Sequence, residues 1–129
     1  MSNAGLGVFG LAGVVENWGN PRLCTLYLWM LAACVCSATH HAVRTGTVRR
    51  LTLVLDLAPI LVSVVLNLAY GTLAYWTPTT AFMALTAAAF LLNDLVDYVP
   101  VPWGHVMWHV SVSSAVAYHY RELALRGFE

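Results

Sequence analysis

Four long apolar segments, each separated from the next by only a few residues, constrain what this chain can fold into. They cover residues 23–43, 51–75, 79–98 and 103–123. A helix of about 20 residues crosses the roughly 30 Å hydrocarbon core of a bilayer. The sequence therefore predicts an all-α integral membrane protein, a helical bundle of four transmembrane helices that forms one domain over residues 1–129.

The composition supports a membrane protein. Hydrophobic residues make up 60% of the chain and charged residues only 9%, whereas a soluble domain carries about 25% charged residues. A chain of 14.1 kDa with a mean hydropathy of +0.71 has too small an interior to bury so much apolar surface. The six basic residues are all arginine and form no patch, so the expected partner is the lipid bilayer and not nucleic acid.

Prolines divide the segments. Pro21 stands in the first turn of the first segment, where its missing N–H costs nothing. Pro59 interrupts the second segment, where it should kink the helix and release a carbonyl group. Pro78 opens the third segment, and Pro100 and Pro102 separate it from the fourth. Such short connections predict antiparallel neighbouring helices.

The segment before the first predicted helix is apolar but short. Residues 5–15 read GLGVFGLAGVV and are rich in glycine. This composition favours an interfacial or re-entrant segment, and a fifth span is left open.

The four spans define two sides of the membrane. The loops at residues 44–50 and 99–102 fall on one side, here called side B. Both termini and the turn at residues 76–78 fall on the other, side A. Each side receives three arginines, so the charge bias that orients membrane proteins leaves the orientation open.

Five polar side chains interrupt the apolar segments close to side B. They are Ser37 and His41 in the first segment, Asp56 in the second, and His105 and His109 in the fourth. At about 1.5 Å per residue, these positions fall in a layer roughly 3–9 Å below the side-B boundary. A charged Asp in the centre of a bilayer costs roughly 2.5–3.5 kcal/mol on insertion scales. Their convergence at one depth therefore predicts a shared functional site.

The residue types suggest a metal. His105 and His109 are one helical turn apart, so their rings share a helix face, and His41 would add a third imidazole. Three protein ligands and an open position are typical of catalytic zinc, which lowers the pKa of its bound water to about 7. Asp56 would orient a ligand or accept the proton of the water. Ser37 would donate a hydrogen bond to the water or to a developing oxyanion.

Each residue also has an interpretation without catalysis. A membrane histidine can simply pack and form hydrogen bonds between helices. Ser37 can bond to the carbonyl group four residues earlier in its own helix. Asp56 can pair with Arg49 or Arg50 near side B.

Other polar residues raise further alternatives. His40 stands about 100° around the helix from His41, and which of them would be the ligand is left open by the spacing. Asp94 and Asp97 either pair with arginines of the 44–50 loop, or they interact with the metal ligands and so tune the metal site without binding the ion.

Three residues farther from side B have simpler roles. Asn67 is predicted to form a hydrogen bond between helices. His119 and Tyr120, near side A, are predicted to occupy the membrane interface.

The five polar residues resemble a family pattern. The chain has Ser-x-x-x-His at the end of one span, Asp early in the next, and His-x-x-x-His early in the last. This arrangement resembles the CREST superfamily of membrane hydrolases, which includes alkaline ceramidases, adiponectin-type receptors and lipases of GPI-anchor remodelling. The Asp-x-x-Pro of Asp56 and Pro59, and Trp108 immediately before His109, are similar to the alkaline ceramidase branch.

The resemblance implies a function and a cofactor. His41, His105 and His109 would bind Zn²⁺, while Asp56 and Ser37 would assist the attacking water. The implied activity is hydrolysis of an amide or ester bond in a ceramide-like membrane lipid. The superfamily has seven spans, whereas this chain offers four or five, so a homo-oligomer that rebuilds the larger bundle is left open.

Two other functional classes are compatible with the same residues. Histidines on opposite helices can hold haem in a membrane electron-transfer protein. Alternatively, the polar cluster can join helices in a non-catalytic membrane assembly protein.

Overall fold

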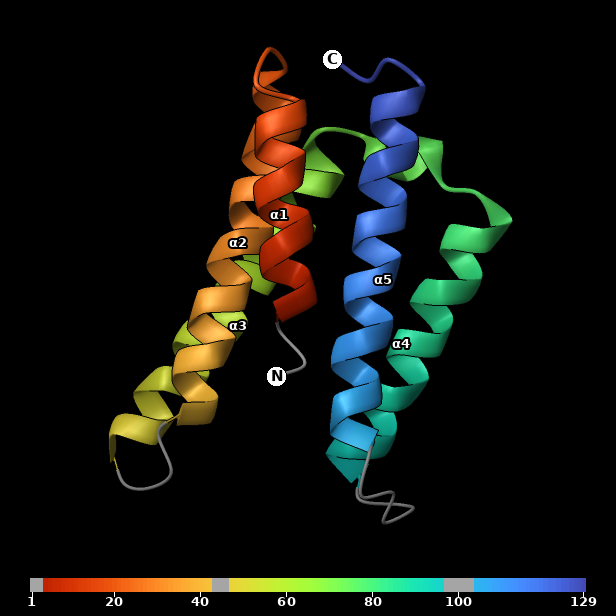
Figure 1. Ribbon diagram of the computed structural model, residues 1–129. Helices are drawn as coiled ribbons and strands as arrows, with labels where there is room; N and C mark the ends of the chain where they lie inside the picture. Colours follow the sequence, from red (N-terminus) through yellow and green to blue (C-terminus); the bar gives the residue numbers. More distant parts are fainter. Residues whose placement is uncertain (1–3, 43–46, 97–103) are drawn as a thin grey trace.

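The computed structural model describes residues 4–42, 47–96 and 104–129 (Figure 1). Every regular element in these ranges is helical, which confirms the all-α class. In chain order the elements are α1 (Ala4–Glu16), α2 (Pro21–Ala42), α3 (Thr47–Ala69), the 3₁₀ helix η1 (Thr72–Tyr75), α4 (Pro78–Val96) and α5 (Gly104–Leu125).

Pro21 and Pro78 begin helices as the sequence predicts, and the kink expected at Pro59 stays a prediction. Helix α2 begins at Pro21, α4 begins at Pro78, and Pro59 lies inside α3. The fourth apolar segment is α5, which continues to Leu125, two residues beyond its predicted end.

The expectation that the second segment is helical as far as Tyr75 was wrong. Helix α3 ends at Ala69, and Gly71 adopts the left-handed conformation with φ of 69°. Glycine enters this region without steric cost. The Thr72 hydroxyl then donates to the carbonyl oxygen of Asn67 at 3.2 Å, which satisfies a carbonyl in the last turn of α3.

The long helices form two hairpins. Helix α2 packs against α3, and α4 packs against α5, whereas the backbones of α3 and α4 stay more than 8 Å apart, Cα to Cα, within the described residues. The hairpins meet beside η1 and diverge toward side B (Figure 1). The expected closed four-helix bundle is therefore corrected to two hairpins joined at one end, because the connection through η1 spreads α3 away from α4.

Residues 5–15 belong to α1, which packs between α2 and α5. Close approach to α2 requires glycine at two positions. A Cβ on Gly13 would lie 2.2 Å from the Tyr27 ring, and one on Gly10 would lie 2.7 Å from Cγ of Leu31. Because α1 runs antiparallel to α2, the beginning of α1 lies partway toward side B (Figure 1). The expectation that the N-terminus lies on side A falls on residues 1–3, which are outside the described residues.

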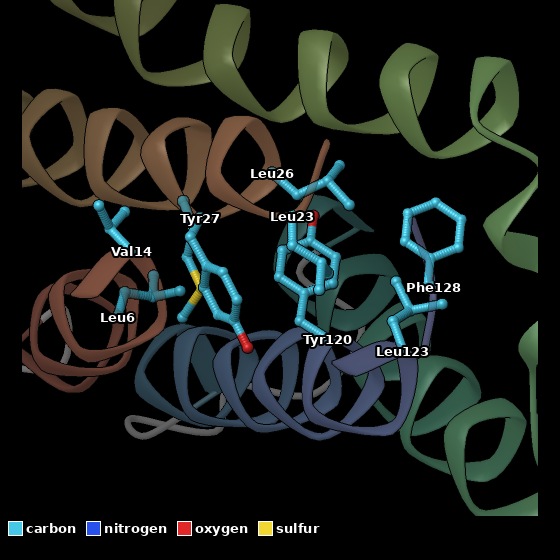
Figure 2. Close-up of a cluster of buried hydrophobic side chains, with 9 residues drawn as sticks. Leu6, Val14, Leu23, Leu26, Tyr27, Tyr120, Leu123 and Phe128 are labelled. Atoms are coloured by element: carbon cyan, nitrogen blue, oxygen red, sulfur yellow. The ribbon is translucent and has the colours of Figure 1, made fainter. Parts of the chain in front are cut away.

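The hydrophobic core lies in the side-A half, where α2 meets α5. Leu23, Leu26, Tyr120 and Leu123 are almost completely buried there (Figure 2). The rings of Tyr27 and Tyr120 meet edge to face, with centroids 5.3 Å apart. The prediction that Tyr120 lies at the membrane interface was wrong, because its ring completes this core.

The rest of the surface is strongly apolar. The chain exposes 8195 Å², whereas a globular monomer of 14.1 kDa exposes roughly 6,700 Å². Exposed large apolar side chains follow α3 along its length: Leu51, Val54, Leu55, Leu57, Leu61, Val64, Val65 and Leu68. Apolar patches of this size are typical of surfaces that a membrane or a partner covers.

Among the described residues, one helical stretch, Pro21–His40, is both long and apolar enough to cross a membrane. Only 28% of its most apolar window is buried, whereas the core helix of a soluble protein is mostly buried. The stretches Gly5–Glu16, Val54–Ala69 and Pro78–Asn93 are apolar but shorter.

Candidate functional site

The hairpins are joined by a small polar network at their side-A end. The Asn67 side-chain amide of α3 donates to the Tyr120 hydroxyl of α5 at 3.1 Å, and the Thr72 hydroxyl donates to Oδ1 of Asn67 at 2.7 Å. We call Tyr27, Asn67, Thr72 and Tyr120 the clasp. The predicted interhelical hydrogen bond of Asn67 is thus confirmed.

Three candidate residues lie at the same distance, measured along their helices, from the level of the clasp. Each stands eleven residues, or about three helical turns, from a residue at the level of the clasp. The pairs are Leu26 and Ser37 on α2, Asn67 and Asp56 on α3, and Tyr120 and His109 on α5.

Eleven residues return an α-helix to nearly the same face, about 20° away. Ser37, Asp56 and His109 therefore lie on nearly the same faces of their helices as Leu26, Asn67 and Tyr120. Because α3 and α5 run opposite to α2, all three steps lead toward side B. They end at one common level about 16 Å from the clasp. Ser37 and His109 are 4% and 7% exposed, and Asp56 is half-buried.

Ser37 differs from two other hydroxyl groups on α2. Thr25 and Thr39 donate to the carbonyl groups four residues earlier, at 2.7 and 2.8 Å. The Ser37 hydroxyl is buried and has no hydrogen-bond partner within the described part of the chain. The interpretation that Ser37 bonds back to its own helix was therefore wrong. A buried hydroxyl that is left unpaired lowers the free energy of unfolding by about 1–3 kcal/mol. The Ser37 hydroxyl therefore remains available to form a hydrogen bond with another buried group.

The remaining predicted ligands are located only through their helices. His41 lies on α2 and His105 on α5, but their side chains fall outside the described residues, as do those of Asp94, Asp97 and Arg49. The choice between His40 and His41, and the pairing of Asp56 with an arginine, stay predictions.

The structure does not bring the two halves of the site into contact. Ser37 and Asp56 belong to the α2–α3 hairpin, whereas His109 belongs to the α4–α5 hairpin, and the hairpins diverge at this end (Figure 1). Among the described side chains, no three His, Cys, Asp or Glu residues are close enough to hold one metal ion. His41 and His105, two of the three predicted zinc ligands, have side chains that are not among those described.

His119 is a buried polar residue that the sequence interpretation placed at the interface. It is 6% exposed, and neither ring nitrogen has a partner in the described ranges. Its ring meets Trp76 at a steep angle, with centroids 6.2 Å apart. Its position near side A agrees with the sequence, whereas its burial inside the molecule was not expected. Its place at a membrane interface stays a prediction.

Comparisons with protein-family models, curated proteins and solved structures found no match to this chain. The resemblance to the CREST superfamily therefore depends only on the motifs quoted above.

Proposed function

We propose that this chain is a zinc-dependent membrane hydrolase that cleaves an amide or ester bond of a ceramide-like lipid. The observation that carries the proposal is the common level of Ser37, Asp56 and His109 and the burial of Ser37 and His109. The buried hydroxyl of Ser37, which has no partner among the residues that the structure describes, adds a hydrogen-bond donor at that level.

The donor set fits zinc. His41 follows Ser37 by four residues and His105 precedes His109 by four. Each therefore continues the inward face of its helix by about one turn toward side B. In this proposal His41, His105 and His109 hold Zn²⁺, since imidazole nitrogen is a preferred zinc ligand. Bound zinc supplies hydroxide at neutral pH by lowering the pKa of its water.

The other two residues act on the reacting groups. The Asp56 carboxylate accepts a proton from the attacking water or fixes the orientation of an imidazole. The Ser37 hydroxyl donates to the substrate carbonyl oxygen as negative charge develops on it. The lack of a hydrogen-bond partner for this hydroxyl among the described residues supports the role. A hydroxyl already bonded to its own helix would have to exchange partners during the reaction.

A membrane lipid suits the surroundings of this layer. In the proposal α2, α3, α4 and α5 cross the bilayer, and the exposed apolar side chains of α3 contact acyl chains. The polar layer then lies a few ångströms inside side B, where the amide or ester linkage of a lipid joins its acyl chains to the head group. An acyl chain would run from this layer toward the membrane centre.

Metal analysis of the detergent-purified protein tests the proposal, with a visible spectrum of the same sample. We expect about one zinc per chain in the wild type and loss of most of it in His109→Ala. His119→Ala is the matched control, because His119 lies on the same helix but near side A, and this variant should keep its zinc.

The other outcomes have definite meanings. Zinc that remains in His109→Ala would overturn the assignment of the ligand. A Soret band without zinc would indicate the haem-binding alternative. Neither zinc nor a Soret band would leave a non-catalytic assembly protein, and the hydrolase proposal would be withdrawn.

A further inference from the structure

We propose that the first turn of α1 supplies backbone N–H donors that act together with the hydroxyl of Ser37. The two hold the oxygen atoms of a lipid acyl group, first its carbonyl oxygen and then the carboxylate of the released fatty acid. The inference rests on the proposed function for the identity of the lipid. The position of the donors rests on the packing of α1 against α2.

The antiparallel packing of α1 on α2 fixes the level at which α1 begins. Gly13 lies against the ring of Tyr27, and a Cβ on Gly7 would lie 3.3 Å from Sγ of Cys34. Six residues toward the start of α1 thus correspond to seven residues toward the end of α2. Over three further residues, the same correspondence places the first residue of α1 level with Ser37. The beginning of α1 therefore lies at the level of the proposed site (Figure 1).

The N–H groups at the beginning of α1 are unused hydrogen-bond donors. The first N–H groups of an α-helix have no carbonyl group within the helix to bind. Among the described residues, no hydrogen bond joins the N–H of Gly5 or Leu6 to a group outside α1. No acidic side chain stands in the first turn, so the helix does not itself balance the partial positive charge of this end. A helix end of this kind favours an anionic oxygen group as its ligand.

Ser37 is independent evidence for a ligand at this level. Its side chain is 4% exposed, and its hydroxyl has no hydrogen-bond partner among the described residues. Ser37 follows Cys34 by three residues, which places it about 60° around α2 and about 4.5 Å nearer side B. Because Cys34 lies against Gly7, an oxygen group just beyond the first turn of α1 can accept from the helix end and from Ser37.

The carboxylate of Asp56 lies at the same level but belongs to a different part of the helix arrangement. Helix α1 packs against α2 and α5, whereas the backbones of α1 and α3 stay more than 8 Å apart, Cα to Cα, within the described residues. In the proposed membrane placement, the beginning of α1 lies a few ångströms inside side B, where unsatisfied N–H groups are costly. A separate oxygen group is therefore needed there.

A lipid acyl group supplies oxygen atoms at both stages of hydrolysis. When water attacks the carbonyl carbon, it loses a proton, and the C=O electron pair moves onto the carbonyl oxygen. The N–H groups and the Ser37 hydroxyl stabilise this negative charge. The pair then returns, the bond to the leaving nitrogen or oxygen breaks, and the leaving group takes up the proton. The remaining carboxylic acid ionises, and its two oxygens accept from the same donors.

Binding of laurate to the detergent-purified, full-length protein tests the inference. Isotope-labelled laurate is measured by equilibrium dialysis, and dodecanol is the matched probe, because it has the same chain length but no carboxylate. Dodecyl phosphate tests whether any anionic head group binds equally well. Zinc can also bind a carboxylate, so each measurement is repeated in His109→Ala, and zinc content is determined on every sample.

Substitutions at one glycine separate the donor from the side chain. Gly5→Pro removes one N–H group, and proline is accepted in the first turn of a helix. Gly5→Ala is the matched control that keeps the N–H group, and no atom lies within 4 Å of where a Cβ at Gly5 would be. Thermal unfolding of both variants checks that they fold.

We expect Gly5→Pro and Ser37→Ala each to weaken laurate binding roughly ten-fold or more, the effect of losing one hydrogen bond to a charged group. Gly5→Ala and Thr39→Ala should bind laurate as the wild type does. The affinity for dodecanol should be lower than that for laurate and equal in all these proteins. Laurate should bind more tightly than dodecyl phosphate, and its binding should persist in His109→Ala.

The outcomes distinguish this inference from the proposed function. Equal laurate binding by Gly5→Pro and Gly5→Ala would overturn the role of α1. Equal affinity for laurate and dodecanol would overturn the site, because the apolar chain alone would explain binding, and tighter binding of dodecyl phosphate would overturn the choice of a carboxylate. Laurate binding lost together with zinc in His109→Ala would place the carboxylate on the metal and keep the proposed function. Laurate binding that depends on Gly5 in a protein without zinc would support this site and overturn the hydrolase proposal.

Discussion

Within the described ranges the buried hydroxyl group of Ser37 has no hydrogen-bond partner, which gives Ser37 a chemical meaning that its position in an apolar helix does not. The hydroxyl of Thr39, two residues later, donates a hydrogen bond to the carbonyl oxygen of Val35, as a hydroxyl in an apolar helix usually does. Ser37 makes no such bond. The difference between two neighbouring hydroxyl groups on one helix is the reason for assigning Ser37 to the reaction and Thr39 to the helix.

Replacing Ser37 by alanine should therefore separate activity from stability. We expect Ser37→Ala to lower kcat for hydrolysis of a ceramide-like lipid by about 100-fold, the usual effect of removing one oxyanion donor. Its Tm should stay equal or rise slightly, because an unpaired buried hydroxyl is removed. Thr39→Ala is the control and should keep full activity. Full activity in Ser37→Ala together with a lower Tm would show that Ser37 has only a structural role.

At the scale of elements, the packing of α1 on α2 depends on glycine at particular positions. Gly13 lies directly against the ring of Tyr27, which is 6% exposed and part of the core. Gly5, near the start of the same helix, has nothing within 4 Å of where a Cβ would be. The two positions have the same residue type in the same helix but opposite surroundings.

Alanine at these two glycines should have opposite effects on stability. Gly13→Ala should lower the free energy of unfolding by about 1–3 kcal/mol, because Tyr27 must leave its place in the core. Gly5→Ala should be neutral or stabilising by about 0.5–1 kcal/mol, since alanine favours a helix over glycine. Thermal unfolding of both variants beside the wild type measures the difference. Equal effects would show that α1 is not packed on α2 through Gly13.

At the scale of the whole molecule, the end of α5 completes the junction of the two hairpins. Gly127 takes a left-handed φ of 65°, and the N–H of Phe128 donates to the carbonyl oxygen of Leu123 at 3.0 Å. This Schellman turn directs the Phe128 ring back into the core against Tyr75, with centroids 5.4 Å apart. Phe128 thus links α5 with η1, the element from which the hairpins diverge.

Truncating Phe128 should weaken that junction. We expect Phe128→Ala to lower the free energy of unfolding by about 3 kcal/mol or more, as for other buried phenylalanines. Leu125→Ala is the control, because Leu125 is 70% exposed, and it should change stability little. Denaturant unfolding of the two variants in detergent compares them. Indistinguishable midpoints would show that Phe128 does not contribute to the core.

Much of the local structure follows from the sequence alone. Apolar length, together with Pro21 and Pro78, predicted that four long helices form and where two of them begin, because these are properties of neighbouring residues along the chain. The end of α3 was missed because Gly71 alone does not reveal whether an apolar helix stops or continues. That choice depends on the bonds that Thr72 makes to Asn67.

The tertiary structure decided which face of each helix packs against another segment. The sequence placed Ser37, Asp56 and His109 near one depth, since depth depends only on helical rise. That they lie on the same helix faces as Leu26, Asn67 and Tyr120, which meet in the tertiary structure, emerged only from the contacts of those three residues, since a helix can rotate about its axis without changing its sequence pattern. The divergence of the hairpins and the burial of His119 likewise depend on packing between segments distant in the chain, which no local pattern encodes.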